Sequence, residues 1–159
     1  MNIRIVCAGK MKESFFIEAA REYEKRLSRF VTLTVSEVAD EKTPDSMSRA
    51  EELAAMDREG ARMLKCIRDT DYVIALTVDG RRRTSEDFAA HLDALMNRGK
   101  SSIVFVIGGS LGLSRSVTDR ADETLSVSDM TLPHRLCRVF LLEQIYRAYK
   151  INAHETYHK

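Results

Sequence analysis

The sequence predicts an α/β fold in which a mostly parallel sheet carries helices on both faces. Short apolar runs alternate along the chain with longer segments whose apolar residues recur every three or four positions. Strands that alternate with helices are typical of parallel sheets, because each crossover helix returns the chain for another strand in the same direction. The 159 residues, of which 44% are hydrophobic, fit a single domain over residues 1–159 that buries its own core.

Four elements are expected in the first half of the chain. They are a strand at Asn2–Cys7, a helix at Glu13–Arg29, a strand at Val31–Val38 and a helix at Ser48–Arg68. The apolar residues expected on the inner faces of the two helices are Phe15, Phe16, Ala19, Tyr23 and Leu27 in the first, and Leu53, Met56, Met63, Leu64 and Ile67 in the second. Gly60 weakens the second helix by about 1 kcal/mol relative to alanine. The polar Asp40–Asp45 segment, which contains a proline, is expected to be a loop.

The second half continues the alternation and ends in an unusually apolar helix. The expected elements are a strand at Tyr72–Val78 that Asp79-Gly80 turns, a helix that begins at Ser85 and stops at Gly99, a strand at Ser102–Ile107, a short helix at Leu113–Arg120, a short strand at Thr124–Val127 and a last helix at Pro133–Lys150. Ser85 is the expected N-cap of its helix. The last helix is apolar on nearly every side, which indicates either a homo-oligomer interface or a helix threaded through its own core.

Charge and cysteine usage narrow the class of protein. The formal net charge of +1 creates no overall field that attracts nucleic acid. RNA binding would therefore need local patches such as Arg81–Arg83, or Lys10 with Lys12, which are otherwise solvated surface. The three cysteines are far apart and form no CxxC motif, and no apolar segment is long enough for a signal peptide or a membrane span. We therefore expect a cytoplasmic protein with no membrane association.

The first of two candidate ligand loops is Gly108-Gly109-Ser110-Leu111-Gly112, which follows an apolar strand. Glycine lets backbone amides approach a ligand closely, and ligands of open α/β sheets bind beyond the carboxyl ends of the strands. A plain turn is the alternative. The loop is not a dinucleotide-binding GxGxxG motif, because Ile107 occupies the position of the first glycine. Gly99-Lys100-Ser101 does not end a P-loop motif, because Ala94 occupies the position of that motif's first glycine.

The second candidate loop, Val127–Leu132, connects a strand to the last helix with small and polar residues. Ser128, Asp129 and Thr131 can satisfy loop amides or cap the helix, and ligand binding by the backbone of the same loop is compatible with either role. No nucleophile–base pair is evident. His154 and His158 are four residues apart, but no cysteine or carboxylate cluster completes a metal site around them, so no metal is expected.

Several motifs, in order along the whole chain, resemble the ribosomal RNA large subunit methyltransferase H family of the SPOUT superfamily. The segments that carry this resemblance are Ile5–Lys10, Arg21–Leu27, Val73–Gly80, Phe105–Gly109, Met130–His134, Glu143–Tyr149 and Tyr157–Lys159. The resemblance implies a SPOUT-type α/β knot, with a C-terminal trefoil knot that sequence patterns cannot show. It also implies a homodimer built on the knotted region.

The same resemblance implies an enzyme with S-adenosylmethionine as its cofactor. The family's cofactor-binding positions fall on Leu76, Gly108, Val127, Ser128, Asp129, Met130, Thr131 and Leu132. The implied reaction methylates N3 of pseudouridine 1915 in helix 69 of 23S rRNA, within the assembled 70S ribosome. In the family the C-terminal tail reaches the partner subunit's cofactor, so Tyr157, His158 and Lys159 are candidates for substrate contact and catalysis. His134 is a second candidate base, and helix capping or core packing is its alternative role.

Two other functions compete with the methyltransferase. A nucleotide-binding oxidoreductase would use the glycine loop, but the missing GxGxxG motif and the short chain that remains after the loop argue against it. A non-enzymatic ribosome-binding factor of the same fold would transfer no methyl group.

Overall fold

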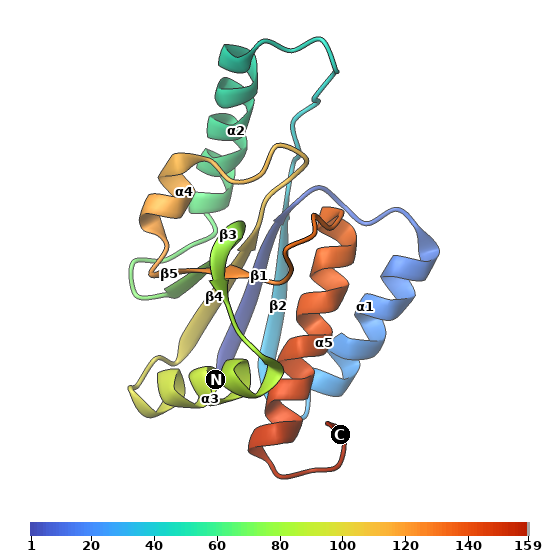
Figure 1. The fold of residues 1–159 in the computed structure, drawn as a ribbon, viewed down its shortest axis with the longest axis vertical. Coiled ribbons are helices and arrows are strands. Elements are labelled where there is room, and N and C mark those ends of the chain that lie inside the picture. The colour runs from blue at the N-terminus through green and yellow to red at the C-terminus, as the bar shows by residue number, and fades with distance from the viewer. Residues whose placement is uncertain (159) are drawn as a thin grey trace.

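A five-stranded sheet forms the centre of the computed structural model, which describes residues 1–158 (Figure 1). The strands are β1 (Asn2–Ala8), β2 (Thr32–Val38), β3 (Tyr72–Arg82), β4 (Ser102–Ile107) and β5 (Glu123–Ser126). They lie in the order β2-β1-β4-β3-β5, and each neighbouring pair is parallel. The prediction of a mostly parallel sheet is therefore confirmed.

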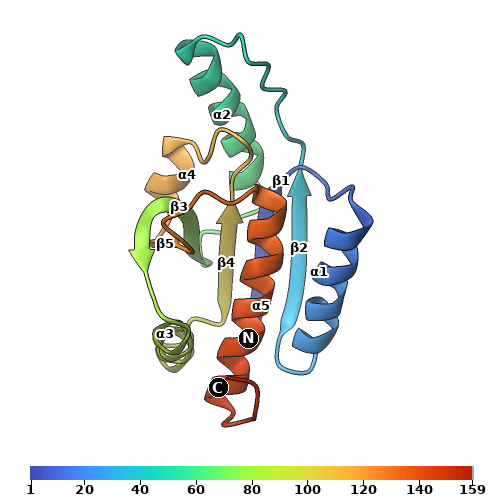
Figure 2. The same ribbon diagram turned by 45° about the vertical axis from the view of Figure 1, so that its right-hand side comes forward.

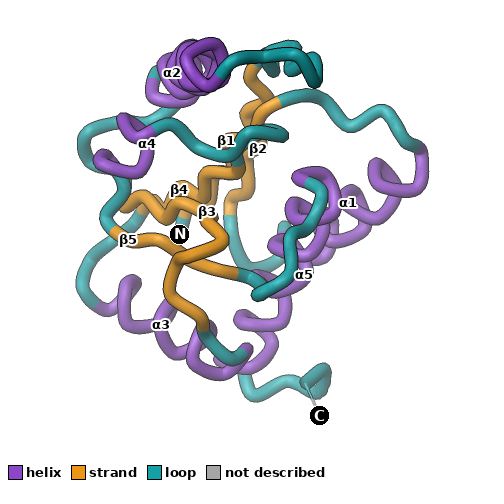
Figure 3. Tube along the Cα trace, turned by 45° about the horizontal axis from the view of Figure 1, so that its top comes forward, coloured by secondary structure: helices purple, strands orange, loops and turns teal. Residues whose placement is uncertain are grey.

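Helices cover both faces of the sheet, as the alternation predicts (Figures 2 and 3). They are α1 (Ser14–Leu27), α2 (Arg49–Leu64), α3 (Ser85–Asn97), α4 (Arg115–Arg120) and α5 (His134–Asn152). On one face, α1, α3 and α5 enclose a core with Ile3, Ile5 and Phe105. On the other face, α2 and α4 enclose a smaller core with Val6 and Val104. Alternate residues of β1 and β4 point to opposite cores, which explains why these strands are apolar over most of their length.

Two residues expected on inner helix faces are exposed. Phe15 in the first turn of α1 is 63% exposed, because the buried residues Ala20 and Leu27 set the inner face and Phe15 lies about 140° from Ala20 at 100° per residue. Leu53 is 45% exposed because α2 begins well beyond the sheet, so its first turns have nothing to pack against (Figure 1).

The helix boundaries differ slightly from those predicted. The N-cap of α3 is Thr84, whose hydroxyl accepts a hydrogen bond from the Asp87 amide. Ser85 is therefore not the cap, and its hydroxyl donates instead to Gln144 on α5. α2 is shorter than expected and starts with a capping box in which Ser48 and Glu51 satisfy each other's backbone amides.

Gly60 has a packing role that the sequence did not suggest. A Cβ at this position would lie 2.1 Å from the Ser114 hydroxyl oxygen, so glycine allows α2 to pack directly against the start of α4. The close contact between α2 and α4 thus compensates for the free-energy cost of a glycine within the helix.

Strand β3 continues through Asp79 and Gly80 to Arg82, so the prediction that these two residues turn the chain is wrong. Its pairing with β5 shifts register, so that Leu125 is opposite both Leu76 and Arg81. Gly80 lies where the chains cross, since a Cβ there would be 2.6 Å from the Leu125 carbonyl carbon. The strand therefore bulges outward between its two pairings. The trefoil knot stays a prediction.

Candidate functional site

A cavity of about 690 Å³ opens where β4 and β5 end, beside Leu76–Val78 in the middle of β3. Its walls are the outward bulge of β3, the glycine loop after β4 and the loop from β5 to α5. The residues that line it are Leu76, Thr77, Val78, Ile107, Gly108, Gly109, Ser110, Leu111, Gly112, Leu125, Ser126, Val127, Ser128, Met130, Thr131, Leu132, Pro133, His134 and Cys137. Seven of the eight residues predicted to bind a cofactor lie in this set, so the structure brings together the two loops predicted from the sequence.

The glycine loop is closed tightly on itself. Gly112 has a φ of +87°, and the loop bridges Gly109 to Gly112. A Cβ at Gly108 would lie 2.6 Å from the Gly112 carbonyl carbon, so no larger residue fits there without moving the backbone. The Gly109 amide donates a hydrogen bond of 3.1 Å to the Glu59 carboxylate behind the loop. The loop therefore presents backbone, without side chains, on the cavity side of Gly108.

The second loop is held by its own serines. The Ser126 hydroxyl donates to the Ser128 carbonyl, and the Ser128 hydroxyl accepts a 2.9 Å hydrogen bond from the Met130 amide. Satisfaction of a loop amide is therefore confirmed for Ser128. The N-cap of α5 is Pro133, without a side-chain cap, so the alternative that a polar loop residue caps this helix is wrong. Asp129 does not line the cavity; its carboxylate forms an exposed ion pair with Arg82.

Two polar atoms of the cavity wall are buried without a hydrogen-bond partner within the described residues. They are Thr77 Oγ1 and His134 Nε2. A buried polar atom without a partner costs free energy, so both are candidates for contact with a ligand. Thr77 was missed because the sequence predicted a strand that ends in a simple turn. Burial lowers the pKa of His134, and the Arg135 guanidinium acts in the same direction, so the ring is neutral at pH 7.

The predicted catalytic tail lies far from this cavity in the same chain. His134 is the first residue of α5, whereas the tail follows the other end of this helix and folds back, so that Tyr157 and His158 lie beside Glu143–Arg147 in its second half. The Tyr157 hydroxyl donates to Glu143, and burial with this hydrogen bond raises the pKa of Tyr157. His158 contacts Arg147 and Glu86. Lys159 lies outside the described residues.

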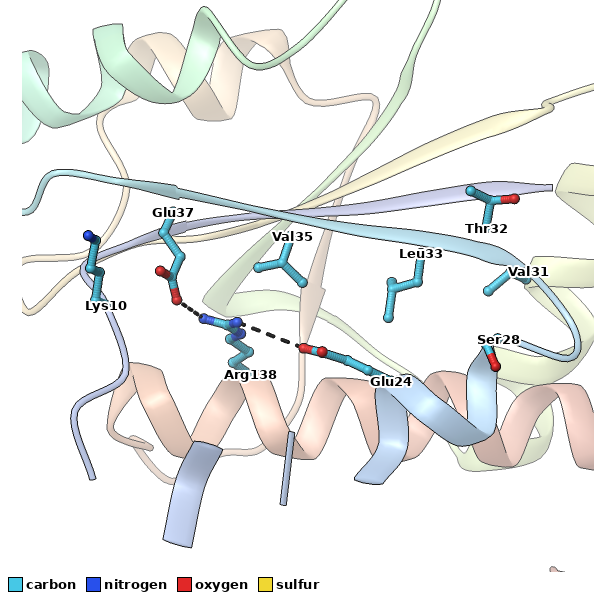
Figure 4. A pocket seen from close by; sticks show the side chains of 9 residues that line it. All are labelled: Lys10, Glu24, Ser28, Val31, Thr32, Leu33, Val35, Glu37 and Arg138. Atoms are coloured by element: carbon cyan, nitrogen blue, oxygen red, sulfur yellow. Dashed lines mark hydrogen bonds and ion pairs between the residues drawn. The ribbon is translucent and has the colours of Figure 1, made fainter. Parts of the chain in front are cut away.

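A second hollow, of about 770 Å³, runs along the edge strand β2 (Figure 4). Arg138 of α5 crosses it, 2.6 Å from Glu37 on β2 and 3.9 Å from Glu24 on α1. Lys10 and aliphatic side chains of β2 complete the lining. This hollow contains none of the residues predicted to bind a cofactor, and its arginine is already paired.

Most basic residues of the Arg81–Arg83 patch and of helix α5 are also paired. The pairs are Arg82 with Asp129, Arg83 with Glu123, Arg135 with Glu13, Arg138 with Glu37, Arg147 with Glu143 and Lys150 with Glu155. These contacts favour a structural role for the arginines of α5. The cysteines Cys7, Cys66 and Cys137 are free thiols. Within residues 1–158, no helix has the length and apolar character that a membrane span requires.

Comparison with known proteins gives a match over nearly the whole chain. A family model described as "Predicted SPOUT methyltransferase" matches residues 1–158. Proteins named ribosomal RNA large subunit methyltransferase H from Listeria monocytogenes, Clostridium novyi and Bacillus cytotoxicus are 52%, 53% and 52% identical to this chain, each over 159 residues and the full length of both proteins.

Proposed function

Because this chain belongs to the SPOUT methyltransferase family, we propose that the cavity at the ends of β4 and β5 binds S-adenosylmethionine and that the enzyme methylates large-subunit ribosomal RNA. The observation that carries the proposal is the convergence of the glycine loop and the Val127–Leu132 loop on one cavity. The names of the full-length relatives support the RNA substrate. The finer target that we propose is N3 of pseudouridine 1915 in helix 69 of 23S rRNA.

The cavity has features that fit this cofactor. Backbone at Gly108 allows the close approach that a purine base or a ribose requires, and the unpartnered Thr77 hydroxyl can accept or donate a hydrogen bond. The main chain of the Val127–Leu132 loop offers further amides and carbonyls. The bound cofactor would supply an activated methyl group on a sulfonium, whose departure as a neutral thioether makes positioning a large part of catalysis.

The acceptor nitrogen loses its proton when it gains the methyl group, so a base or an electrostatic helper is needed. His134 is one candidate, because its ring borders the cavity and is neutral at pH 7. The other candidates are Tyr157, His158 and Lys159 of the tail. The raised pKa of Tyr157 keeps its hydroxyl protonated, so this group would act as a hydrogen-bond donor to the substrate once it releases Glu143.

The tail candidates can act only if a second copy brings them to the cavity. Within one chain Tyr157 and His158 contact Glu143 and Arg147 in the second half of α5, whereas His134 is the first residue of this helix. Leu136 and Phe140, on the first turns of α5, are 39% and 37% exposed, and Met130 beside them in the chain is 78% exposed. An exposed apolar strip next to a ligand cavity is typical of a subunit interface. We therefore propose a homodimer in which the tail of each subunit completes the partner's site.

The near-neutral charge bears on how RNA is recognised. With a net charge of +1 and most arginines paired, a strong electrostatic attraction to free RNA is not expected. Recognition of the shape of an assembled ribosome, together with local contacts, fits this charge better. Equal rates on naked helix 69 and on intact ribosomes would contradict this part of the proposal.

The decisive experiment is transfer of labelled methyl from S-adenosylmethionine to 70S ribosomes purified from a strain that lacks the modification. We expect label at a single pseudouridine of 23S rRNA, located by nuclease digestion and mass spectrometry. Ribosomes that already carry the modification are the control and should take up no label. Binding of the cofactor without transfer to either ribosome sample would indicate a non-enzymatic ribosome-binding factor.

A further inference from the structure

The carboxylate of Glu59 is buried behind the glycine loop, in a helix that takes no part in the cavity. The residue is 7% exposed, although α2 is otherwise rich in solvated charges. Within residues 1–158 no lysine, arginine or histidine forms an ion pair with it. A buried carboxylate that lacks a cation is costly, so its hydrogen bonds must hold it in place.

Those hydrogen bonds go to the backbone of two separate loops. Oε1 of Glu59 accepts a hydrogen bond of 3.1 Å from the Gly109 amide, in the glycine loop after β4. Oε2 accepts one of 3.2 Å from the Glu41 amide, in the loop after β2. The two carboxylate oxygens thus join loops that follow different strands, and hydrogen bonds from backbone amides to a carboxylate are stronger than those between neutral groups.

The residue next in sequence holds the other end of the same loop. Gly60 packs against Ser114, the N-cap of α4, which lies two residues after the glycine loop. At the other end, the carboxylate oxygens of Glu59 would lie 3.0 and 3.1 Å from a Cβ at Gly109, so this contact is also close. α2 therefore supports both ends of the loop that forms one wall of the cavity.

The support is itself rigid. Glu41 forms ion pairs with Arg58 and Arg62, which flank Glu59 on α2. The hydrogen bond of Arg62 to the Ala39 carbonyl adds a further contact between α2 and the end of β2. A carboxylate on a helix anchored in this way can fix the position of a flexible glycine segment.

We propose that Glu59 is a positioning residue for the cofactor: its carboxylate holds Gly109, and through it Gly108, in the conformation that binds S-adenosylmethionine. This inference depends on the proposed function. It predicts that loss of the carboxylate weakens cofactor binding, although Glu59 does not line the cavity. It also predicts little effect on the chemical step once the cofactor is bound.

The test uses Glu59→Gln, which retains one acceptor oxygen and turns an NH₂ group toward a backbone amide, and Glu59→Asp, which keeps the charge but is too short to reach both amides. We expect the KM for S-adenosylmethionine and the Kd for S-adenosylhomocysteine to rise about tenfold in both variants, with kcat at saturating cofactor within about twofold of wild type. Calorimetry and ribosome methylation assays on the full-length enzyme measure these constants.

Asp71→Asn is the matched control. Asp71 is also a buried carboxylate that accepts hydrogen bonds, from the Arg68 amide and the Ser102 hydroxyl, and it pairs in addition with Arg4. It lies where β3 and β4 begin, at the opposite end of the strands from the cavity. We expect its melting temperature to fall at least as much as that of the Glu59 variants, with an unchanged KM for the cofactor.

The outcomes separate the positioning role from its alternatives. Wild-type cofactor affinity in both Glu59 variants, or an equal loss in Asp71→Asn, would overturn the inference and leave the proposed function intact. A loss for S-adenosylmethionine but not for the uncharged thioether product would show that Glu59 acts by its charge, which would also overturn the positioning role. Failure of the wild-type protein to bind either compound would overturn the proposed function and this inference with it.

Discussion

The cavity at the ends of β4 and β5 and the groove along β2 differ little in volume, about 690 and 770 Å³, but they are lined by different groups. The cavity is lined mainly by apolar side chains, with glycine backbone and a few small polar residues between them, and two of its polar atoms have no partner in the described residues. In the groove, Arg138 is paired with Glu37 although its Nε has no hydrogen-bond partner in the described residues, and Lys10 and Glu24 add one charge of each sign (Figure 4). An apolar lining with convergent backbone, more than volume or unsatisfied polar atoms, therefore distinguishes the proposed binding site from the groove.

The variant with the largest expected effect tests whether the cavity is sufficient for methyl transfer without the tail. Truncation after Thr156 removes Tyr157, His158 and Lys159. We expect methyl transfer to ribosomes to fall by about a thousandfold, the size typical of a lost general acid or base. The Kd for S-adenosylhomocysteine should stay within about twofold of wild type, because neither Tyr157 nor His158 lines the cavity. Unchanged turnover would show that the cavity acts alone and that the tail is not part of the site.

Gly108→Val tests the cavity wall directly. The new side chain would collide with the Gly112 backbone, so we expect the affinity for S-adenosylmethionine to fall roughly a hundredfold, by isothermal titration calorimetry. Val35→Ala in the groove is the control and should bind the cofactor normally. If Gly108→Val retained wild-type affinity while Val35→Ala lost it, the assignment of the two hollows would have to be exchanged.

Arg138→Met tests the expectation that the groove contributes to the stability of the fold and not to cofactor binding. It leaves the carboxylate of Glu37 without its partner beside a buried core, so urea denaturation should show a loss of about 1–3 kcal/mol in the free energy of unfolding. The cofactor Kd should not change. A cofactor affinity that fell in parallel with stability would mean that the groove and the cavity are coupled through α5.

The smallest expected effect concerns His134 and pH. Burial lowers the pKa of this ring in the folded protein, so below the ordinary value of about 6.5 the unfolded chain binds a proton that the folded one does not. The stability from the neutral ring is complete above that value and is lost as the pH falls toward the folded-state pKa. Thermal melts between pH 5 and 8 should show wild type losing stability relative to His134→Gln on acidification; parallel curves would contradict this environment for His134.

Sequence patterns identified the two loops of the cavity because glycine after a buried strand and small polar residues before a helix are local signals. They also predicted the parallel sheet, since strands alternate with helices along the chain. Contacts between residues far apart in the sequence could not be predicted from these local patterns. Glu59 resembles the solvated glutamates around it, and its partner Gly109 is 50 residues away. Thr77 was missed because the bulge of β3 depends on where β5 crosses at Gly80. Thr84 and Ser85 are equally able to cap a helix, so the exact boundary could not be chosen.

The single long helix α5 also sets a geometric scale for the proposed dimer. His134, the first residue of α5, lines the cavity, and the tail follows the last turn of this helix. The length of α5 therefore sets the distance between the cavity and the tail, which meet across subunits in the proposed dimer. Each residue inserted into the helix would move its far end by about 1.5 Å and rotate it by about 100°. Over evolution, the length of this helix should therefore be far more constrained than its outward-facing side chains.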